Sequence, residues 1–452
     1  MRRSFLLLAG LALAASAAAA QNAPRALSLR EAVALALDES PQMAAAEARA
    51  DQAAARVTQA RSTWLPQIQL SETWTEGDNP VYVFGSLLEQ GKFGPQHFDP
   101  VFLNDPPSFE NYRTALSLRA PVFDQFRRIS RIGQAHLGAR GARAGLTGTR
   151  QQMIFETLRL YDGVALAEQQ KRVAEETVRT AEADVAKIRD LAETGLVVQS
   201  DLLAGEVQLA EFQQRLIEAE GNVAIARAAL AAALGLSAAE PLELTSALGA
   251  PPADELPLAD LIAGASQNRP DLVGSDVAQR AARLETRIAR GSWLPRLDAF
   301  ATFGASGASV GDQDGDALYG AVVTLDILQP GRQGRVAEAR AGERAAEAEA
   351  ERLRRNAEVE ILSAHYRLTT ARQSLDVAER NVARAEETFR IVRDRYAAGL
   401  TTITEQLRAQ TALLGARLNL LAARSAARVG YAGVLLASGR LESIDSVLGG
   451  TQ

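Results

Sequence analysis

The sequence predicts a mainly α-helical protein with a small β part, in which long helices alternate with four short strands. Proline is absent from Val122 to Glu240 and from Gly331 to the end of the sequence, and proline interrupts helix interiors. Aromatic residues make up only 5 % of the chain, while Ala, Leu, Glu, Arg and Gln fill the long segments between breaks. Short stretches in which apolar and polar residues alternate predict the strands.

The helical part carries a seven-residue repeat. Glu343–Ala398 contains neither glycine nor proline, and a helix of that length would span roughly 84 Å. Apolar residues recur in it at seven-residue steps, namely Ile361, Leu368, Leu375, Val382, Phe389 and Tyr396. The first half repeats the pattern less strictly, and Lys171 interrupts it. Seven-residue spacing favours coiled-coil packing of antiparallel helices.

Four stretches alternate with period two, namely Gln67–Trp74, Tyr112–Ala120, Arg296–Phe303 and Leu318–Leu328. We expect them to form two hairpins, at about 65–122 and 294–328, with loops over Glu76–Asn111 and Gly304–Ala317. Their lengths suit transmembrane β-strands, although soluble edge hairpins are the alternative. Four strands cannot close a barrel alone, so several chains would have to pool them.

The chain contains an internal duplication. Glu39–Pro66 and Asn268–Pro295 align without a gap, and both end in Trp-Leu-Pro just before a predicted strand. A second pair, Ile188–Leu196 and Val392–Leu400, lies downstream. We therefore divide the chain into a signal peptide, a first repeat, a linker, a second repeat and a tail, at residues 1–20, 21–236, 237–255, 256–440 and 441–452.

The N-terminus predicts export from the cytoplasm. Arg2 and Arg3 precede the apolar run Phe5–Ala15, and Ala18–Ala20 supplies small residues before a cleavage site. A short N-terminal anchor is the alternative. Beyond this leader no stretch is apolar for long enough to predict a helical membrane span, and the best candidate, Val223–Leu236, contains Arg227.

Composition excludes several classes of function. A net charge of −6 argues against a nucleic-acid binder. The chain has no cysteine, which excludes disulfides, thiolate metal sites, a cysteine nucleophile and N-terminal lipidation. The three histidines, His97, His136 and His365, lack metal-ligand spacing, and we read His365 and Tyr366 as packing residues. No group of convergent acids and bases predicts an enzyme, and we expect no cofactor.

Two glycine turns end the long helices. Gly195 and Gly399 can adopt the left-handed conformation that terminates a helix. Ser200 and Thr404 are of the type that begins the next helix, with an acid just behind each. The residues alone predict two αα-hairpin turns.

Residues from about 27 to 440 resemble the TolC family of outer-membrane efflux proteins. The resemblance rests on the opening Leu27–Leu37, the two Trp-Leu-Pro junctions and the two Gly-Leu turns, in this order. It implies a homotrimer whose twelve strands, four per protomer, form one β-barrel that continues into a long periplasmic α-helical tunnel. The implied function is a passive exit duct of a tripartite efflux or type I secretion system, in the outer membrane of a Gram-negative bacterium.

The resemblance also implies partners for the two turns. A periplasmic adaptor would dock at the hairpin tips, on Gly195, Leu196, Ser200, Leu203, Gly399, Leu400, Thr404 and Leu407. An inner-membrane pump of the resistance-nodulation-division or ABC type would complete the system. The rival interpretation is a structural periplasmic coiled-coil protein without a channel.

The family's periplasmic gate is matched only in part. Tyr396 and Asp201 occupy positions of its Tyr/Arg/Asp network, and Glu405 keeps one ring carboxylate. Thr401 stands where the family pattern has an arginine, and Arg408 replaces the second ring acid. A ring of Glu405 beside Arg408 would form ion pairs, so we expect a pore that is less cation-selective than one with an all-acid gate.

Overall fold

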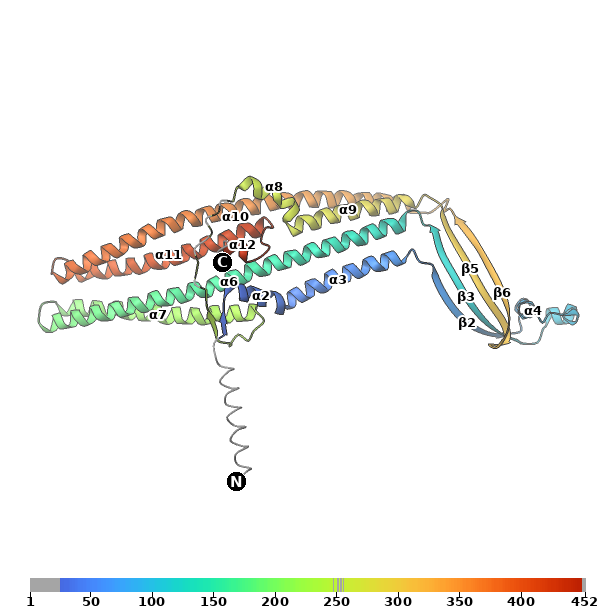
Figure 1. The fold of residues 1–452 in the computed structure, drawn as a ribbon, viewed down its shortest axis with the longest axis horizontal. Helices are drawn as coiled ribbons and strands as arrows, with labels where there is room; N and C mark the ends of the chain where they lie inside the picture. Colours follow the sequence, from blue (N-terminus) through green and yellow to red (C-terminus); the bar gives the residue numbers. More distant parts are fainter. Residues whose placement is uncertain (1–24, 247, 250–251, 253, 255, 449–452) are drawn as a thin grey trace, which may run out of the picture. The chain divides into compact units, whose positions relative to one another are not determined.

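The computed structural model describes residues 25–246, 248–249, 252, 254 and 256–448 (Figure 1). The predicted signal peptide lies outside these residues. The chain forms two compact units. The first comprises Met1–Arg49, Arg143–Gly274 and Glu351–Gln452, and the second comprises Ala50–Ala142 and Ser275–Ala350. Four helices contribute residues to both units, namely α3 (Pro41–Ser62), α6 (Arg127–Glu193), α9 (Pro270–Gly291) and α10 (Arg332–Ala397).

The second unit contains one antiparallel sheet of four strands in the order β2-β3-β5-β6 (Figure 1). The strands are β2 (Gln67–Gly77), β3 (Phe109–Phe123), β5 (Arg296–Ser309) and β6 (Asp312–Thr324). All four predicted strands are therefore present, and each of the two expected hairpins pairs along its length. Both β2 and β6 lie at an open edge of the sheet.

The expected loop Gly304–Ala317 is wrong, because strands occupy most of it. β5 continues to Ser309 and β6 begins at Asp312, so the turn consists of Val310 and Gly311. Asp314 and Asp316 alternate with smaller residues and pair with Ser306 and Gly304 in the ladder. The polar composition suggested a loop although the period of two persists. The predicted strand end at Leu328 is also wrong, since β6 ends at Thr324.

The expected loop Glu76–Asn111 instead contains three short helices, which are α4 (Pro80–Glu89), η1 (Pro95–Phe98) and α5 (Pro100–Asn104). Each begins with proline, which suits the first turn of a helix because that position needs no backbone donor. The Asn79 side chain caps α4 by accepting from the Val81 and Tyr82 amides at 3.1 and 3.2 Å. Because proline and glycine are typical of loops, the composition of this segment did not predict these helices.

The register gives the sheet two chemically different faces, because cross-strand partners share a face. The apolar face carries Ile68, Leu70, Trp74, Leu116, Phe303, Tyr319 and Val323. Its polar exception, Glu72, accepts a hydrogen bond from the Thr114 hydroxyl. The polar face carries Gln67, Gln69, Ser117, Arg119 and Thr302, with Phe300, Leu318 and Val322 among its apolar exceptions.

Both Trp-Leu-Pro segments form the same junction between a helix and a strand. Helices α3 (Pro41–Ser62) and α9 (Pro270–Gly291) end just before them, and β2 and β5 begin just after. The Arg128 guanidinium lies 4.3 Å from the centroid of the Trp64 ring. Arg332 repeats this contact on Trp293 at 4.7 Å. The duplicated sequence therefore builds a duplicated cation–π contact.

The first unit is built on two helical hairpins. Helix α6, of 67 residues, is followed by α7 (Gln199–Ala233), and α10, of 66 residues, is followed by α11 (Ile403–Ala437). A 66-residue helix is about 100 Å long. Every member of the predicted stripe from Ile361 to Tyr396 is buried or half-buried. Lys171, which interrupts the first stripe, pairs with Glu220 at 3.2 Å.

The main core surrounds the middle of these hairpins. Helix α2 (Leu29–Glu39) packs there, and a short parallel pair joins β1 (Arg25–Leu27) to β4 (Leu242–Leu244). The buried Tyr161 hydroxyl donates to the Leu27 carbonyl at 2.9 Å and accepts from the Ser246 amide at 3.1 Å. Helix α8 (Leu258–Asn268) contributes Leu261 and Ala265. β4 shows that the expected linker, although irregular, carries one structural strand.

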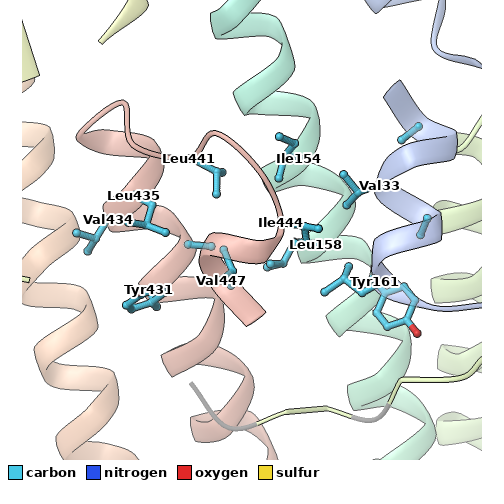
Figure 2. Close-up of a cluster of buried hydrophobic side chains, with 14 of the residues drawn as sticks. Val33, Ile154, Leu158, Tyr161, Tyr431, Val434, Leu435, Leu441, Ile444 and Val447 are labelled. Carbon is cyan, nitrogen blue, oxygen red and sulfur yellow. The ribbon is translucent and has the colours of Figure 1, made fainter. Parts of the chain in front are cut away.

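The C-terminal segment completes this core, although its sequence predicts only a tail. It forms helix α12 (Asp445–Leu448). Figure 2 shows Leu441, Ile444 and Val447 between Tyr431 and Leu435 of α11 and Ile154 and Leu158 of α6. Only four apolar residues of this segment contact the core, with Leu448 as the fourth, which is too few for a periodic signal. The division of the chain into two repeats at the predicted boundaries stays a prediction.

Within the described residues one helix, α11, is long and apolar enough to cross a membrane by length and composition alone. Its C-terminal half contributes Tyr431, Val434 and Leu435 to the main core. We therefore read α11 as a core helix of the first unit.

Candidate functional site

Each helical hairpin ends in a glycine turn with the same hydrogen bonds. Gly195 and Gly399 adopt φ of 75° and 72°, as predicted. The Gly195 amide donates to the Ala192 carbonyl at 3.0 Å and the Leu196 amide donates to Leu191 at 2.9 Å. Gly399 and Leu400 donate to Tyr396 and Arg395 at 2.9 Å each. This pattern satisfies the carbonyls at the helix end and reverses the chain.

Ser200 and Thr404 do not cap the following helices, which corrects the sequence prediction. Helix α7 begins at Gln199 after Val198, and α11 begins at Ile403 after Thr402. Neither preceding residue makes a side-chain cap. Each helix begins two residues earlier than expected, which places both hydroxyls inside the first helical turn. Asp201 and Glu405 still lie in that first turn, where a carboxylate interacts favourably with the helix dipole.

The two tips present apolar side chains to solvent. Leu196 is 73 % exposed, Leu400 is 67 % exposed and Leu203 is 53 % exposed. Val198, which the sequence prediction omitted, is also exposed. Leu407 differs from these, because it is half-buried against the interior of the tip. The predicted docking residues thus include an exposed group and one packing residue.

A small hydrophobic cluster joins the two hairpins just behind their tips. Val185, Ile188 and Leu202 from the first hairpin pack with Ile403 from the second. Tyr396 and Leu407 lie at the margin of this cluster. The cluster therefore packs one predicted gate residue, Tyr396, and one predicted docking residue, Leu407, against side chains of the first hairpin.

Tyr396 and Asp201 lie close enough to interact electrostatically, and Asp184 joins them. Burial, followed by the nearby charges of Asp201 and Asp184, raises the pKa of the Tyr396 hydroxyl. That hydroxyl is buried and has no hydrogen-bond partner among the described residues. Sequence reasoning missed Asp184, which sits next to the apolar stripe residue Val185 and looks like a solvated coiled-coil position.

Asp184 belongs to a buried polar group inside the tip. Burial raises its pKa, while a hydrogen bond from Gln406 and the charges of Arg393 and Lys187 oppose that rise. Gln406 and Gln410 are almost fully buried. Polar atoms of Asp184, Gln406 and Gln410 have no partner within the described part of the chain. Such groups destabilise a packed interior, so the tip is held together less strongly than the main core.

The other predicted gate residues lie on the outside of the tip. The Arg408 guanidinium contacts the Glu405 carboxylate at 3.1 Å, and both side chains are more than half exposed. This is the ion pair that the sequence predicts. Thr401 is half-buried within the turn.

A buried ion pair lies in the first unit, away from the tips. The Arg428 guanidinium is 3.4 Å from the Asp162 carboxylate, with side chains 4 % and 1 % exposed. Burial raises the pKa of Asp162 to about 6, although the Arg428 charge opposes this. Nothing in the sequence pattern singles out this pair, because its members lie on helices α6 and α11.

The histidines contribute no metal centre among the residues that the structure describes, where no group of three His, Cys, Asp or Glu side chains could hold a metal. His136 contacts the Arg61 guanidinium at 3.0 Å. His365 is half-buried and meets Tyr366 edge to face at 5.9 Å. Tyr366 itself is 59 % exposed, so its prediction as a packing residue is wrong.

Comparisons with known proteins point to one family. A family model described as "Outer membrane efflux protein" matches residues 32–236 and 261–440. Protein CyaE of Bordetella pertussis is 26 % identical over 398 residues, covering 86 % of this chain and 79 % of CyaE. The pyoverdine export outer membrane protein OpmQ of Pseudomonas putida is 26 % identical over 407 residues, covering 86 % and 81 %.

The fold matches solved structures over almost the whole chain. A crystal structure of CusC, described as forming a transmembrane channel, superposes with a TM-score of 0.78 at 17 % identity. The match covers 91 % of this chain and 92 % of CusC. The outer membrane channel CmeC of Campylobacter jejuni gives a TM-score of 0.77, covering 91 % and 85 %. At such low identity the likeness shows the fold.

Proposed function

Because this chain belongs to the outer membrane efflux proteins, the TolC family of channels, we propose that it is the passive exit duct of a tripartite efflux or type I secretion system. The family is non-enzymatic and lies in the bacterial outer membrane, with a helical extension into the periplasm. Family membership implies assembly as a trimer. The proposal concerns which role this chain has among the outer-membrane channels of the family and which of its residues perform that role.

One observation carries the proposal, which is a sheet with one apolar face and two open edges. Unpaired backbone groups at an edge cannot remain in lipid, so β2 and β6 must pair with other copies. Three copies then supply twelve strands to one barrel, with the apolar face toward lipid and the polar face toward the lumen. N-terminal lipidation requires a cysteine, and this chain has none, so we propose that the barrel is not lipidated.

We assign adaptor docking to the exposed leucines of the tips. Leu196 and Leu400 lie in the glycine turns and Leu203 lies in the first turns of α7, and all three expose apolar side chains to solvent. Clusters of exposed apolar residues mark protein interaction sites. A periplasmic adaptor with helical hairpins of its own would cover them, and an inner-membrane pump of the resistance-nodulation-division or ABC type would deliver cargo. OpmQ is named for pyoverdine export, which makes pyoverdine one candidate cargo.

Site-specific crosslinking tests this assignment. Because the chain has no native cysteine, only the introduced cysteine can react. Leu196→Cys and Leu400→Cys should crosslink to the adaptor in cells that carry the complete system. Val359→Cys, an exposed apolar position of α10 away from the tips, is the matched control and should not. Crosslinking of Val359→Cys as efficient as that of the tip variants would refute docking at the tips.

We propose that Tyr396, Asp201 and Asp184 form the inner layer of the periplasmic gate and that Glu405 and Arg408 form its outer layer. The Glu405–Arg408 ion pair neutralises the carboxylate that would otherwise attract cations. Multivalent cations should therefore block single-channel current only weakly. Block at low cation concentration in the wild type would contradict the assignment, and Arg408→Gln should strengthen block.

A periplasmic structural protein without a channel is the competing function. It predicts recovery in the soluble periplasmic fraction after cell lysis. The channel predicts that the chain stays in the outer-membrane fraction until detergent is added.

A further inference from the structure

A cavity of about 900 Å³ lies at the end of the sheet that adjoins the helices. Its charged lining consists of four arginines and two aspartates, namely Arg119, Arg127, Arg128, Arg296, Asp124 and Asp298. All of them belong to the second unit. The cavity therefore carries an excess of positive charge, although the whole chain is acidic.

Two of the arginines are neutralised within the cavity. Arg296 contacts Asp298 at 2.7 Å. Arg128 contacts Asp124 at 3.4 Å and stacks on Trp64. Neither Arg119 nor Arg127 has a carboxylate within 4.0 Å among the residues that the structure describes, and both are exposed. These two guanidinium groups are free to bind an anion.

The sheet register places Arg119 on the polar face. It pairs with Gln67 on one side and with Phe300 on the other, and the next rung toward the outer end contains Ser117, Gln69 and Thr302. Asp298 and Arg296 follow on the same face of β5. The polar face lines the lumen in the barrel proposed above, and the present inference rests on that function.

The opposite end of the polar face has a different charge balance. Arg113 contacts Glu89 at 3.0 Å and Asp316 at 2.9 Å, and Asp314 lies opposite Ser306 in the ladder. Acids therefore outnumber bases at the outer end, while unpaired arginines collect at the helix end. The charge is segregated along the strands, as expected for a site at one level of a pore.

We propose that the arginine cavity is a lumenal binding site for multivalent anions that carry carboxylate or phosphate groups. Guanidinium groups bind such oxygens in pairs of parallel hydrogen bonds. Arg127 is also the first residue of α6, where the helix dipole adds favourable potential for an anion. Three copies around one lumen would present the site three times to a passing solute.

The phosphate of a lipid headgroup shares this chemistry, and the geometry favours a soluble anion. Arg119 shares its face with Gln67, Ser117 and Thr302, whereas Leu70, Trp74 and Phe303 form the face suited to lipid. A headgroup would have to reach around the sheet edge to contact Arg119.

The test uses purified full-length oligomer in planar bilayers of neutral phosphatidylcholine, with tripolyphosphate as the probe. Open-channel conductance is recorded first, because its absence would refute the proposed function and not the anion site. Tripolyphosphate should then block the wild-type current. The double variant Arg119→Gln/Arg127→Gln should need at least about tenfold more tripolyphosphate for half-block. Raising the salt concentration should weaken wild-type block, since it screens the charges.

Matched variants keep the test decisive. Arg140→Gln removes an exposed arginine of α6 that does not line the cavity, and it should leave block unchanged. A heat-stable oligomer on gels shows that the double variant is folded. Equal block of wild type and double variant would overturn the proposal. A second result would also overturn it: block by tripolyphosphate is unchanged in the double variant, but the double variant binds less anionic lipid than the wild type in bilayers that contain phosphatidylglycerol. The arginines would then bind lipid headgroups.

Discussion

At the scale of single residues, the first unit contains a buried carboxylate whose charge opposes folding near neutral pH. Asp162 and Arg428 are both almost completely buried, and neither Asp162 oxygen has a hydrogen-bond partner in the described structure. Removing an ion from water is costly, and one arginine at 3.4 Å does not fully compensate. The pair is better explained by specific orientation of α6 against α11 than by net stability.

The pKa of Asp162 predicts a pH dependence with a defined sign. Its folded pKa of about 6 lies above the ordinary value of 3.8, so the folded state binds the proton more tightly. This contribution to stability is fully present below about pH 4 and is lost as pH rises toward 6 and above. The full effect is on the order of 3 kcal/mol.

The measurement is the unfolding free energy of wild type and Asp162→Asn from pH 4 to 7. The wild type should lose stability relative to Asp162→Asn as pH rises through this range. Asp376→Asn, at an exposed pair with Arg380, serves as control and should follow the wild type. Parallel pH profiles for wild type and Asp162→Asn would show that the carboxylate is not perturbed.

At the scale of elements, the two turns depend on backbone conformations that favour glycine. Gly195 and Gly399 have positive φ, and a side chain added at either position would meet no atom within 4 Å. Any destabilisation by alanine must therefore come from the backbone conformation and not from a clash. Alanine in this conformation is less favourable than glycine by roughly 1 kcal/mol.

Gly399→Ala should accordingly lower the stability of the second hairpin by about 1 kcal/mol, and Gly195→Ala should do the same in the first. Gly221→Ala, at an exposed interior position of α7 with open space around it, should instead stabilise by about 0.5–1 kcal/mol. Thermal unfolding in detergent measures all three. Stabilisation by Gly399→Ala would mean that the turn does not use the left-handed conformation.

The elements also show what the sequence can and cannot reveal. Long periodic features such as Ile361–Tyr396 and the four strands were predictable, because each carries many residues that repeat one period. The helices of Pro80–Asn104 and the terminal Asp445–Leu448 were not, since short elements give too few repeats. Their positions are fixed by contacts with distant segments, as between Gln90 and the Asn111 side chain at 2.9 Å.

The residues of the candidate site also divide into those that the sequence predicts and those that depend on contacts between distant segments. Gly195, Gly399 and the exposed leucines were found because a turn is a local feature. Asp184, Gln406 and Arg428 were missed because their burial depends on which helices meet. Arg119 was missed for a related reason, since its significance lies in the register that aligns it with Gln67 and Thr302.

At the scale of the whole molecule, three arrangements of charge and apolar surface belong to one protein. A sheet with open edges requires further copies, the exposed leucines at the tips are our proposed docking site for an adaptor, and the unpaired arginines on the polar face are our proposed site for anions. Each follows from backbone groups or side chains that a folded single chain leaves without a partner in the described structure. We therefore propose that the molecule works as an oligomer that binds its partners through the tips.

The central claim is that copies of this chain pool their sheets into one pore. Single-channel recording of the purified, heat-modifiable oligomer in planar bilayers tests it most directly. We predict discrete conductance steps, one per inserted oligomer, and their loss after the oligomer is dissociated by heat. A stable monomer that is released from cells without detergent and gives no conductance steps would contradict the claim.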